Sequence, residues 1–432
     1  MERDHERTAS VKQDLKLGMH AGDRYRTVSE ASILDMCHLA GWACESGEGS
    51  PGRARTREAL EHWIALGLGV RRGAAGERYF DPCEVLNFLK QAGLDGRDAF
   101  WSERVVGTAR RLVVDMRNDD PRKFTVELRR TFNTQSLPTG AALRLRMPLP
   151  LTSDHLGDLE VHPHAVAAGA HVAVSRGRLE VRTQASDSGE VTIGATTTFT
   201  ACPRELNRER SQPDLGAPDL RYLRPREGLI VVSDRVAALA SSLVGADADP
   251  LMAVRAFWNY CIDHFSQGAV HYDQVDMEAS GDWLLDSGWG DCQLVSALFA
   301  SMCRARGIPA RILGGFYLYR TYSTNHYWAE AWIDGQGWMP FDFSCWDLSR
   351  GGQDPAWRDY FFGRIDCRLT NQCLPLDFTG AVGVKIPAAW HIQQSAQPIG
   401  VAVGLFDVEG KLVYRDFVAV VGEKDVCKFP EA

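Results

Sequence analysis

The spacing of apolar residues changes several times along the chain, and the first change sets apart a helical N-terminal region. Residues 1–24 are polar and show no pattern, which predicts a mobile tail. From residue 25 to 111, apolar side chains recur three and four positions apart, as expected for helices that bury one face. The clearest of these helices carries Leu60, Trp63, Ile64 and Leu66.

Two further elements are predicted in this region. Asp81 as N-cap, Pro82 at the first helical position and Gly93 at the end bracket a second helix. Before it, residues 69–80 are predicted to form a short hairpin that resembles a DNA-binding wing. Two neighbouring arginines are normally just a solvated turn, so a helical cap or a docking surface for a partner is the favoured interpretation.

From residue 112 to 205 the period of apolar positions becomes two, which predicts strands. Leu143, Leu145 and Met147 alternate with arginines, and turn residues separate the short apolar runs that follow. We therefore predict an antiparallel β-sandwich-like domain. Strand-like runs return at residues 381–432 as a C-terminal β extension, which completes a sheet or forms a small addition.

Residues 215–380 combine both patterns. Helix signals come first, and three strand-like runs follow them. These runs are Arg311–Tyr319, His326–Ile333 and Trp338–Phe343. Helices followed by an antiparallel sheet predict an α+β domain. Eight of the twelve tryptophans of the chain lie between Trp258 and Trp357, which suits an aromatic-lined cleft, although a well-packed core explains much of this density.

Composition narrows the possible functions. The net charge of −8 over 432 residues argues against a nucleic-acid binder with a broad basic surface. The charged N-terminus and the absence of a long apolar run predict a cytoplasmic protein without a membrane span. The eleven scattered cysteines form no metal or disulfide pattern, so we expect reduced thiols. His162-Pro163-His164 and His171 lack metal spacing, and we predict no metal or cofactor.

Cys292 is the residue that most needs an explanation. It lies where a loop becomes an amphipathic helix, which carries apolar residues at Leu294, Val295 and Leu298 and stops near Gly307. A helix start favours the thiolate, so we expect a thiol pKa below the free value of about 8.5. The alternative is a buried structural cysteine, which is the usual fate of a free thiol.

A thiolate nucleophile needs a histidine to carry the proton and a third group to orient that ring. His326 and Asp342 lie on two predicted strands joined by a turn at residues 334–337. A turn centred on Gly335 places Asp342 opposite Trp328, and therefore diagonal to His326 and within reach of its side chain. We thus predict a three-residue loop or a bulge.

Four motifs together resemble the core of the transglutaminase-like superfamily. These motifs are Gly290-Asp291-Cys292, Arg304-Ala305-Arg306-Gly307-Ile308-Pro309-Ala310-Arg311, His326-Tyr327-Trp328-Ala329-Glu330 and Gly337-Trp338-Met339-Pro340-Phe341-Asp342. The resemblance implies a papain-like α+β core with a thioester on Cys292, His326 as base and then acid, and Asp342 as orienter. The upstream β-domain is similar to those that precede this core in many bacterial members.

The resemblance leaves the rest of the site open. The backbone N–H of Cys292 is the first expected oxyanion donor. Candidates for the second donor or for the cleft wall are Trp283, Trp289, Gln293, Tyr327 and Trp328. His271 is an alternative base.

Four other features are interpreted as structural. Glu330 more simply supports the hairpin than orients the histidine. Cys303 and Cys345 are core or cleft-wall thiols. Residues 364–368 are an internal ion-pair cluster, with substrate recognition as the alternative.

The predicted activity is acyl transfer through a Cys292 thioester, with amide-bond formation or transamidation on a peptidic, amino-acid or carrier-bound acyl substrate. An amine or water is the acceptor. The alternatives are a cysteine peptidase or amidase, and a non-catalytic binding module that keeps the fold. The presence of Cys292, His326 and Asp342 together weighs against the last of these.

Overall fold

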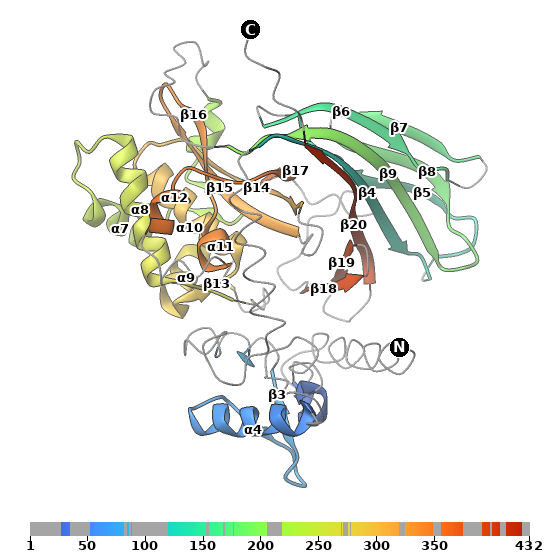
Figure 1. The fold of residues 1–432 in the computed structure, drawn as a ribbon, viewed down its shortest axis with the longest axis horizontal. Coiled ribbons are helices and arrows are strands. Elements are labelled where there is room, and N and C mark those ends of the chain that lie inside the picture. The colour runs from blue at the N-terminus through green and yellow to red at the C-terminus, as the bar shows by residue number, and fades with distance from the viewer. Residues whose placement is uncertain are drawn as a thin grey trace.

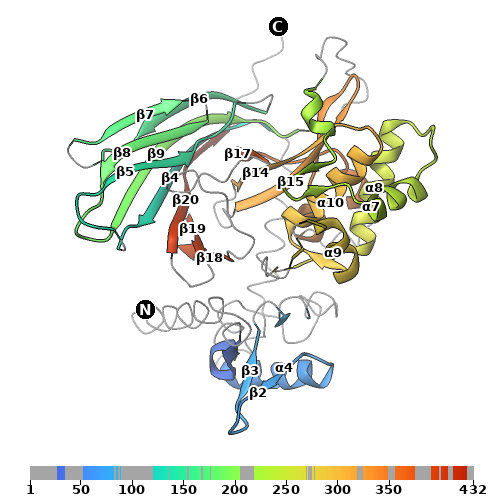
Figure 2. The same ribbon diagram turned by 180° about the vertical axis from the view of Figure 1, so that it is seen from behind.

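The structure is a computed structural model in which helices and antiparallel sheets are both prominent. It describes residues 27–34, 52–81, 84–85, 88, 120–204, 218–318, 325–348, 356–374, 391–406 and 412–425, with gaps inside these ranges at 136, 153–154, 167–168, 176, 269, 271–274, 277 and 398–399. Figures 1 and 2 show a lobe of helices and strands on one side and a lobe of long strands on the other.

The helical lobe packs helices on a four-stranded antiparallel sheet. The strands run in the order β16-β15-β14-β17. Their bounds are β14 (Ala310–Tyr317), β15 (Asn325–Ile333), β16 (Gly337–Phe341) and β17 (Arg368–Leu374). The helices are α7 (Asp234–Leu243), α8 (Pro250–His264), α9 (Ser280–Ser287), α10 (Cys292–Ala305), α11 (Phe343–Leu348) and α12 (Ala356–Tyr360). The predicted α+β class is confirmed.

Helix α10 lies at the centre of this lobe and packs against α7, α8, α9, β14 and β15. The apolar residues that the sequence places on one face, such as Leu294, Leu298 and Phe299, are all buried. The helix ends at Ala305 with Arg306 as its C-cap, and Gly307 follows with a φ of +70°, a conformation that glycine adopts without strain. A central helix of this kind fixes the position of its first residue, Cys292.

The hairpin between β15 and β16 has the predicted register. Ile333 pairs with Gly337 and Ala329 with Phe341, so the three residues 334–336 form the loop. The prediction of a three-residue loop is confirmed. The prediction that Phe343 belongs to the last strand is wrong, because β16 ends at Phe341 and Phe343 begins α11.

The second lobe contains two antiparallel sheets. One has the order β18-β19-β20-β4-β9-β6 and the other the order β5-β8-β7. The bounds are β4 (Arg122–Asn133), β5 (Ala142–Pro148), β6 (Leu156–Pro163), β7 (His171–Ser175), β8 (Arg178–Gln184), β9 (Glu190–Ala201), β18 (His391–Gln397), β19 (Gly400–Phe406) and β20 (Leu412–Asp425). The C-terminal strands therefore complete the sheet to which β4 belongs, with β20 paired to β4.

The two lobes share apolar and backbone contacts along β17. Phe316 and Leu369 of the central sheet belong to the same buried cluster as Phe124 and Val181 of the β-lobe. The backbone N–H of Leu151 donates to the carbonyl of Thr370 at 2.7 Å. Strand β17 is thus held from the β-lobe as well as by its pairing with β14.

The N-terminal region combines a helix with a small sheet. Helix α4 (Gly52–Ala65) buries Leu60 and Trp63, whereas Leu66 lies beyond its end and is 53% exposed, so the prediction that Leu66 shares the buried face is wrong. The predicted hairpin is present as β2 (Arg71–Arg72) and β3 (Arg78–Phe80), and β1 (Val28–Ser29) pairs with β3. The predicted tail at residues 1–24 and most of the helix at 82–93 lie outside the described residues.

No helix in the described part of the chain is both long enough and apolar enough to cross a lipid bilayer.

The aromatic packing on α8 should dominate the stability of the helical lobe. Trp258 is fully buried against Phe341, Phe343 and Phe362. We predict that Trp258→Ala costs about 3–5 kcal/mol of unfolding free energy, because it leaves a large cavity. Met252 on the same helix is 66% exposed, so Met252→Ala should change stability by less than about 0.5 kcal/mol. Urea denaturation followed by far-UV circular dichroism tests both, and equal midpoints would contradict the prediction.

Candidate active site

Cys292 is the first residue of α10, and its position is set by the N-cap Asp291. The Asp291 carboxylate accepts hydrogen bonds from the backbone N–H groups of Gln293 at 3.1 Å and Leu294 at 2.9 Å. The N–H of a first helical residue has no partner within its helix. The Cys292 N–H is therefore suited to receive a developing negative charge next to the sulfur.

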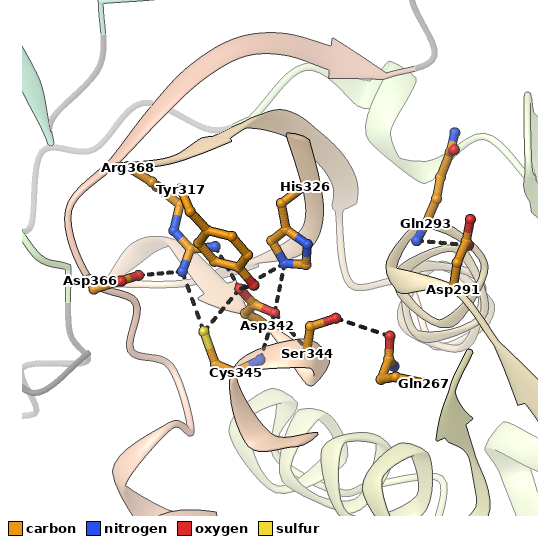
Figure 3. Close-up of polar contacts among 10 residues, drawn as sticks. All are labelled: Gln267, Asp291, Gln293, Tyr317, His326, Asp342, Ser344, Cys345, Asp366 and Arg368. Carbon is orange, nitrogen blue, oxygen red and sulfur yellow. Dashed lines mark hydrogen bonds and ion pairs between the residues drawn. The ribbon is translucent and has the colours of Figure 1, made fainter. Parts of the chain in front are cut away.

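His326 and Asp342 form a hydrogen-bonded pair in the interior. His326 Nε2 lies 2.9 Å from both carboxylate oxygens of Asp342, and both side chains are buried (Figure 3). The register of the β15–β16 hairpin places Asp342 just past the end of β16, where its side chain meets His326 diagonally. With Nε2 facing the carboxylate, Nδ1 is the ring nitrogen left to exchange a proton with a substrate or a thiol.

Asp342 also begins the next helix. Its Oδ1 accepts the backbone N–H groups of Ser344 at 2.9 Å and Cys345 at 3.2 Å, as an N-cap does. Its Oδ2 accepts the Tyr317 hydroxyl at 3.4 Å and the Cys345 thiol at 3.2 Å. The Tyr317 ring stacks on the His326 ring at 4.4 Å, so the same residues hold both members of the pair.

Arg368 from β17 balances the charge of Asp342. Its Nη1 donates to Asp342 Oδ2 at 2.6 Å, and its Nη2 donates to Asp366. The guanidinium lies 4.8 Å from the Trp328 ring and is fully buried. Asp366, Arg368, Asp342 and His326 thus form one buried chain, and the prediction of an internal ion-pair cluster at residues 364–368 is confirmed.

Backbone contacts connect the thiol to the histidine strand. The backbone N–H of Tyr327, the residue next to His326, lies near enough to the Cys292 sulfur to lower the pKa of the thiol. Helix α10 packs on β15 along its length, with Tyr327 and Ala329 in the same buried cluster as the helix. The structure therefore brings Cys292, His326 and Asp342 to one end of the central sheet.

Burial dominates the electrostatics of the thiol. Burial raises the pKa of Cys292 well above its ordinary value, the carboxylates of Asp291 and Asp342 raise it further, and the nearby backbone N–H of Tyr327 only partly opposes them. The expectation of a thiol pKa below about 8.5 is wrong, because burial outweighs the effect of the helix start and the negative Asp291 cap adds to it.

The pKa of His326 is shifted in the opposite direction to that of Cys292. Burial lowers the pKa of His326, although Asp342 raises it in part. Burial would raise the pKa of Asp342, but the charges and hydrogen bonds of His326 and Arg368 hold it far below its usual range. The resting site at neutral pH therefore contains a thiol, a neutral imidazole and a carboxylate.

The other predicted site residues differ in how deeply they are buried. Trp328 is fully buried against Leu313 and Ile365, so its prediction as a cleft residue is wrong. Tyr327 is also buried, beside Cys292. Trp283 and Trp289 are half-buried and meet edge to face at 5.7 Å. The Gln293 side chain points away from His326 and Asp342 (Figure 3).

The competing residues are placed as follows. His271 lies outside the described residues. Glu330 forms an ion pair with Arg311 of the neighbouring strand at 2.7 Å, so it supports the sheet as predicted. Cys303 is buried in the core as predicted. Cys345 is more than a core thiol, because it donates to Asp342.

Sequence reasoning missed three groups near the pair, namely Tyr317, Ser344 and Gln267. Ser344 Oγ donates to Gln267 Oε1 at 3.0 Å, which links the start of α11 to β12 (Ser266–Gln267). A helix signal just after Asp342 would have indicated that this residue is an N-cap. Tyr317 and Gln267 are far from it in sequence, so no local pattern could have found them.

The role of Asp291 can be tested directly. We predict that Asp291→Asn accelerates alkylation of Cys292 by iodoacetamide at pH 8 about threefold to tenfold, since it removes a charge that raises the thiol pKa. Asparagine is an equally good N-cap, so α10 should be preserved. The control is Asp249→Asn at the N-cap of α8. Peptide mass spectrometry gives the rates, and unchanged or slower alkylation would refute this assignment.

Comparisons with known proteins match the part of the chain that contains these residues. Residues 237–343 match the family model of the transglutaminase-like superfamily. Over 122 residues, the chain is 32% identical to protein-glutamine gamma-glutamyltransferase of Pseudomonas aeruginosa. This match covers 25% of the chain and 18% of that relative, so the chain spans less than a fifth of the relative's length.

Two solved structures resemble the chain at low identity. A proposed cysteine protease from Cytophaga hutchinsonii is 15% identical, with 72% of this chain and 92% of that chain covered and a TM-score of 0.41. The periplasmic domain of TgpA from Pseudomonas aeruginosa is 19% identical, with coverages of 57% and 96% and a TM-score of 0.28. On the family match and the sequence relative, the chain carries a core of the transglutaminase-like superfamily at residues 237–343.

Proposed function

We propose that this protein is a cysteine acyltransferase that forms a thioester on Cys292. The observation that carries the proposal is the buried His326–Asp342 pair, held at 2.9 Å on the strand whose next residue, Tyr327, has its backbone close to the Cys292 sulfur. A general base with an orienting carboxylate, beside a thiol at a helix start, is the arrangement that nucleophilic catalysis requires.

The first half-reaction forms the thioester. As the Cys292 sulfur attacks the acyl carbon, its proton passes to Nδ1 of His326 and the carbonyl oxygen becomes an oxyanion. The Cys292 N–H stabilises that charge. Collapse of the intermediate restores the carbonyl and expels the leaving group, which takes the proton from His326.

The second half-reaction runs the same steps in reverse, with a new nucleophile in place of the leaving group. An amine or water attacks the thioester and gives its proton to His326. Collapse releases the acylated product, and the sulfur regains the proton. Asp342 keeps the ring oriented throughout and stabilises the imidazolium between the two transfers.

The acyl donor is proposed to be peptidic, amino-acid or carrier-bound, with an amine as the favoured acceptor. The name of the sequence relative, a protein-glutamine gamma-glutamyltransferase, supports a glutamine side chain as one donor to test. Hydrolysis of an amide or isopeptide is the alternative, and it uses the same first half-reaction.

We also propose the cytoplasm as the location, since the seven described cysteines are free thiols.

Intact-mass trapping tests the proposal. The protein is incubated with a glutamine peptide or an acyl thioester, quenched in acid and weighed. We expect an acyl adduct that maps to Cys292 and is absent from Cys292→Ala. Product formed only with an added amine indicates transfer, and product formed in its absence indicates hydrolysis. Failure of every donor to leave an adduct or a product would favour a non-catalytic module.

Loss of His326 should be far more damaging than loss of a neighbouring aromatic group. We predict that His326→Gln lowers the rate of acylation at least about 10³-fold, because glutamine cannot accept the thiol proton. Tyr327→Phe removes only a phenol next to it and is the matched control, with an expected change below about threefold. Rapid-quench mass spectrometry gives both rates, and a loss below about tenfold for His326→Gln would mean that another base serves.

The pH dependence of the acylation rate should follow the titration of His326. The rate requires neutral His326, whose pKa is lowered by burial, so it should rise with pH through an apparent pKa below 6.5. It should then stay level to at least pH 8.5, because the thiol pKa lies well above its ordinary value. Single-turnover acylation between pH 4.5 and 9 provides the profile. A rate that declines between pH 7 and 8.5 would indicate a thiolate–imidazolium pair instead.

A further inference from the structure

An oxyanion site normally uses two donors, and Cys292 supplies one through its backbone. Gln267 lies on β12, which pairs in parallel with β13 (Trp289–Gly290), and its Cα is in register with Gly290. The N–H of Gly268 donates to the Gly290 carbonyl at 2.7 Å. Gln267 is thereby fixed beside the two residues that lead into Cys292.

The other end of Gln267 is fixed by the segment that carries Asp342. Ser344 Oγ donates to Gln267 Oε1 at 3.0 Å, while the Ser344 backbone N–H donates to Asp342 Oδ1 at 2.9 Å (Figure 3). Gln267 therefore bridges the cysteine side and the histidine–aspartate side of the site. Its side chain comes from neither α10 nor the central sheet.

The Ser344 hydrogen bond determines which way the amide faces. Because Oε1 accepts from the hydroxyl, the Nε2 group with its two N–H donors is turned away from Ser344. Gln267 is 8% exposed, and its Nε2 forms no hydrogen bond with another residue of the described part of the chain. Nε2 is not among the buried unpaired polar atoms of the described residues, so its donors are open to solvent and to the oxygen of a ligand.

The residues suggested by the sequence are less well placed. The Gln293 side chain points away from His326 and Asp342 (Figure 3). Trp283 and Trp289 pack against each other edge to face. None of the three shares the link to Asp342 that Ser344 gives to Gln267.

We infer that Gln267 Nε2 is the second oxyanion donor, and that Ser344 positions it. This inference rests on the proposed thioester chemistry. The amide donates to the carbonyl oxygen of an acyl substrate as that oxygen becomes negative, together with the backbone N–H of Cys292. The donor itself loses no proton, and the negative charge returns to the carbonyl bond when the intermediate collapses.

Two reactions of the same sulfur separate this role from a structural one. Acylation of Cys292 passes through an oxyanion, whereas alkylation by iodoacetamide displaces iodide directly and forms none. We expect Gln267→Met to slow acylation by an acyl thioester about 10²- to 10³-fold and to leave the alkylation rate within twofold. Methionine has the length of glutamine without its donors. Gln336→Met in the β15–β16 loop is the control and should leave both rates unchanged.

A second variant covers the possibility that Gln267→Met does not fold. Ser344→Ala keeps the backbone N–H that Asp342 accepts but releases the amide, and should slow acylation about fivefold to tenfold with unchanged alkylation. An equal loss in both reactions, or no loss in acylation for either variant, would overturn the inference. Wild-type protein that is alkylated but never acylated by any donor would instead overturn the proposed function on which the inference depends.

Discussion

The buried carboxylate of Asp342 is the group on which the rest of the site depends. A charge without solvent is stable only when several partners share it, and here His326, Arg368, the start of α11, Tyr317 and Cys345 all do so. These partners come from β14, β15, β17 and α11. The carboxylate therefore joins elements that are distant in sequence, and removing Arg368 would leave a buried charge that costs about 3–5 kcal/mol.

Burial also decides the protonation state of the proposed catalytic pair, Cys292 and His326, in the free protein. It raises the thiol pKa and lowers the histidine pKa, so the proton stays on sulfur until an acyl group arrives. The carboxylate of Asp342 favours the imidazolium that forms next, since its charge is already present and oriented. Burial thus opposes a thiolate–imidazolium pair of Cys292 and His326 in the free protein. Asp342 stabilises the imidazolium once the sulfur begins to bond to the acyl carbon.

The β-lobe contributes to this arrangement through β17. That strand carries Arg368, and its next residue, Leu369, is buried in the core of the β-lobe. A backbone hydrogen bond from Leu151 to Thr370 holds the following position. The packing of one lobe therefore fixes the cation that neutralises Asp342 in the other, which gives the β-lobe a structural part in the site.

The sequence by itself determined much of this protein, because the deciding information was local. Helical spacing placed Cys292 at the start of α10, and alternation in the β15–β16 hairpin predicted the three-residue loop that aligns Asp342 with His326. Motif order then predicted the resemblance to the transglutaminase-like superfamily whose model residues 237–343 match. Each of these depends on residues that lie close together along the chain.

Only the tertiary structure decided what surrounds these residues. The thiol pKa moved opposite to the expectation because burial and the Asp291 charge outweigh the helix start. Trp328 does not line a cleft because it is buried against Leu313 and Ile365, with Arg368 of β17 over its ring. Arg368 and Gln267 reach the site from strands that pair with distant segments. Desolvation and long-range pairing are properties of the packed chain, and no local pattern encodes them.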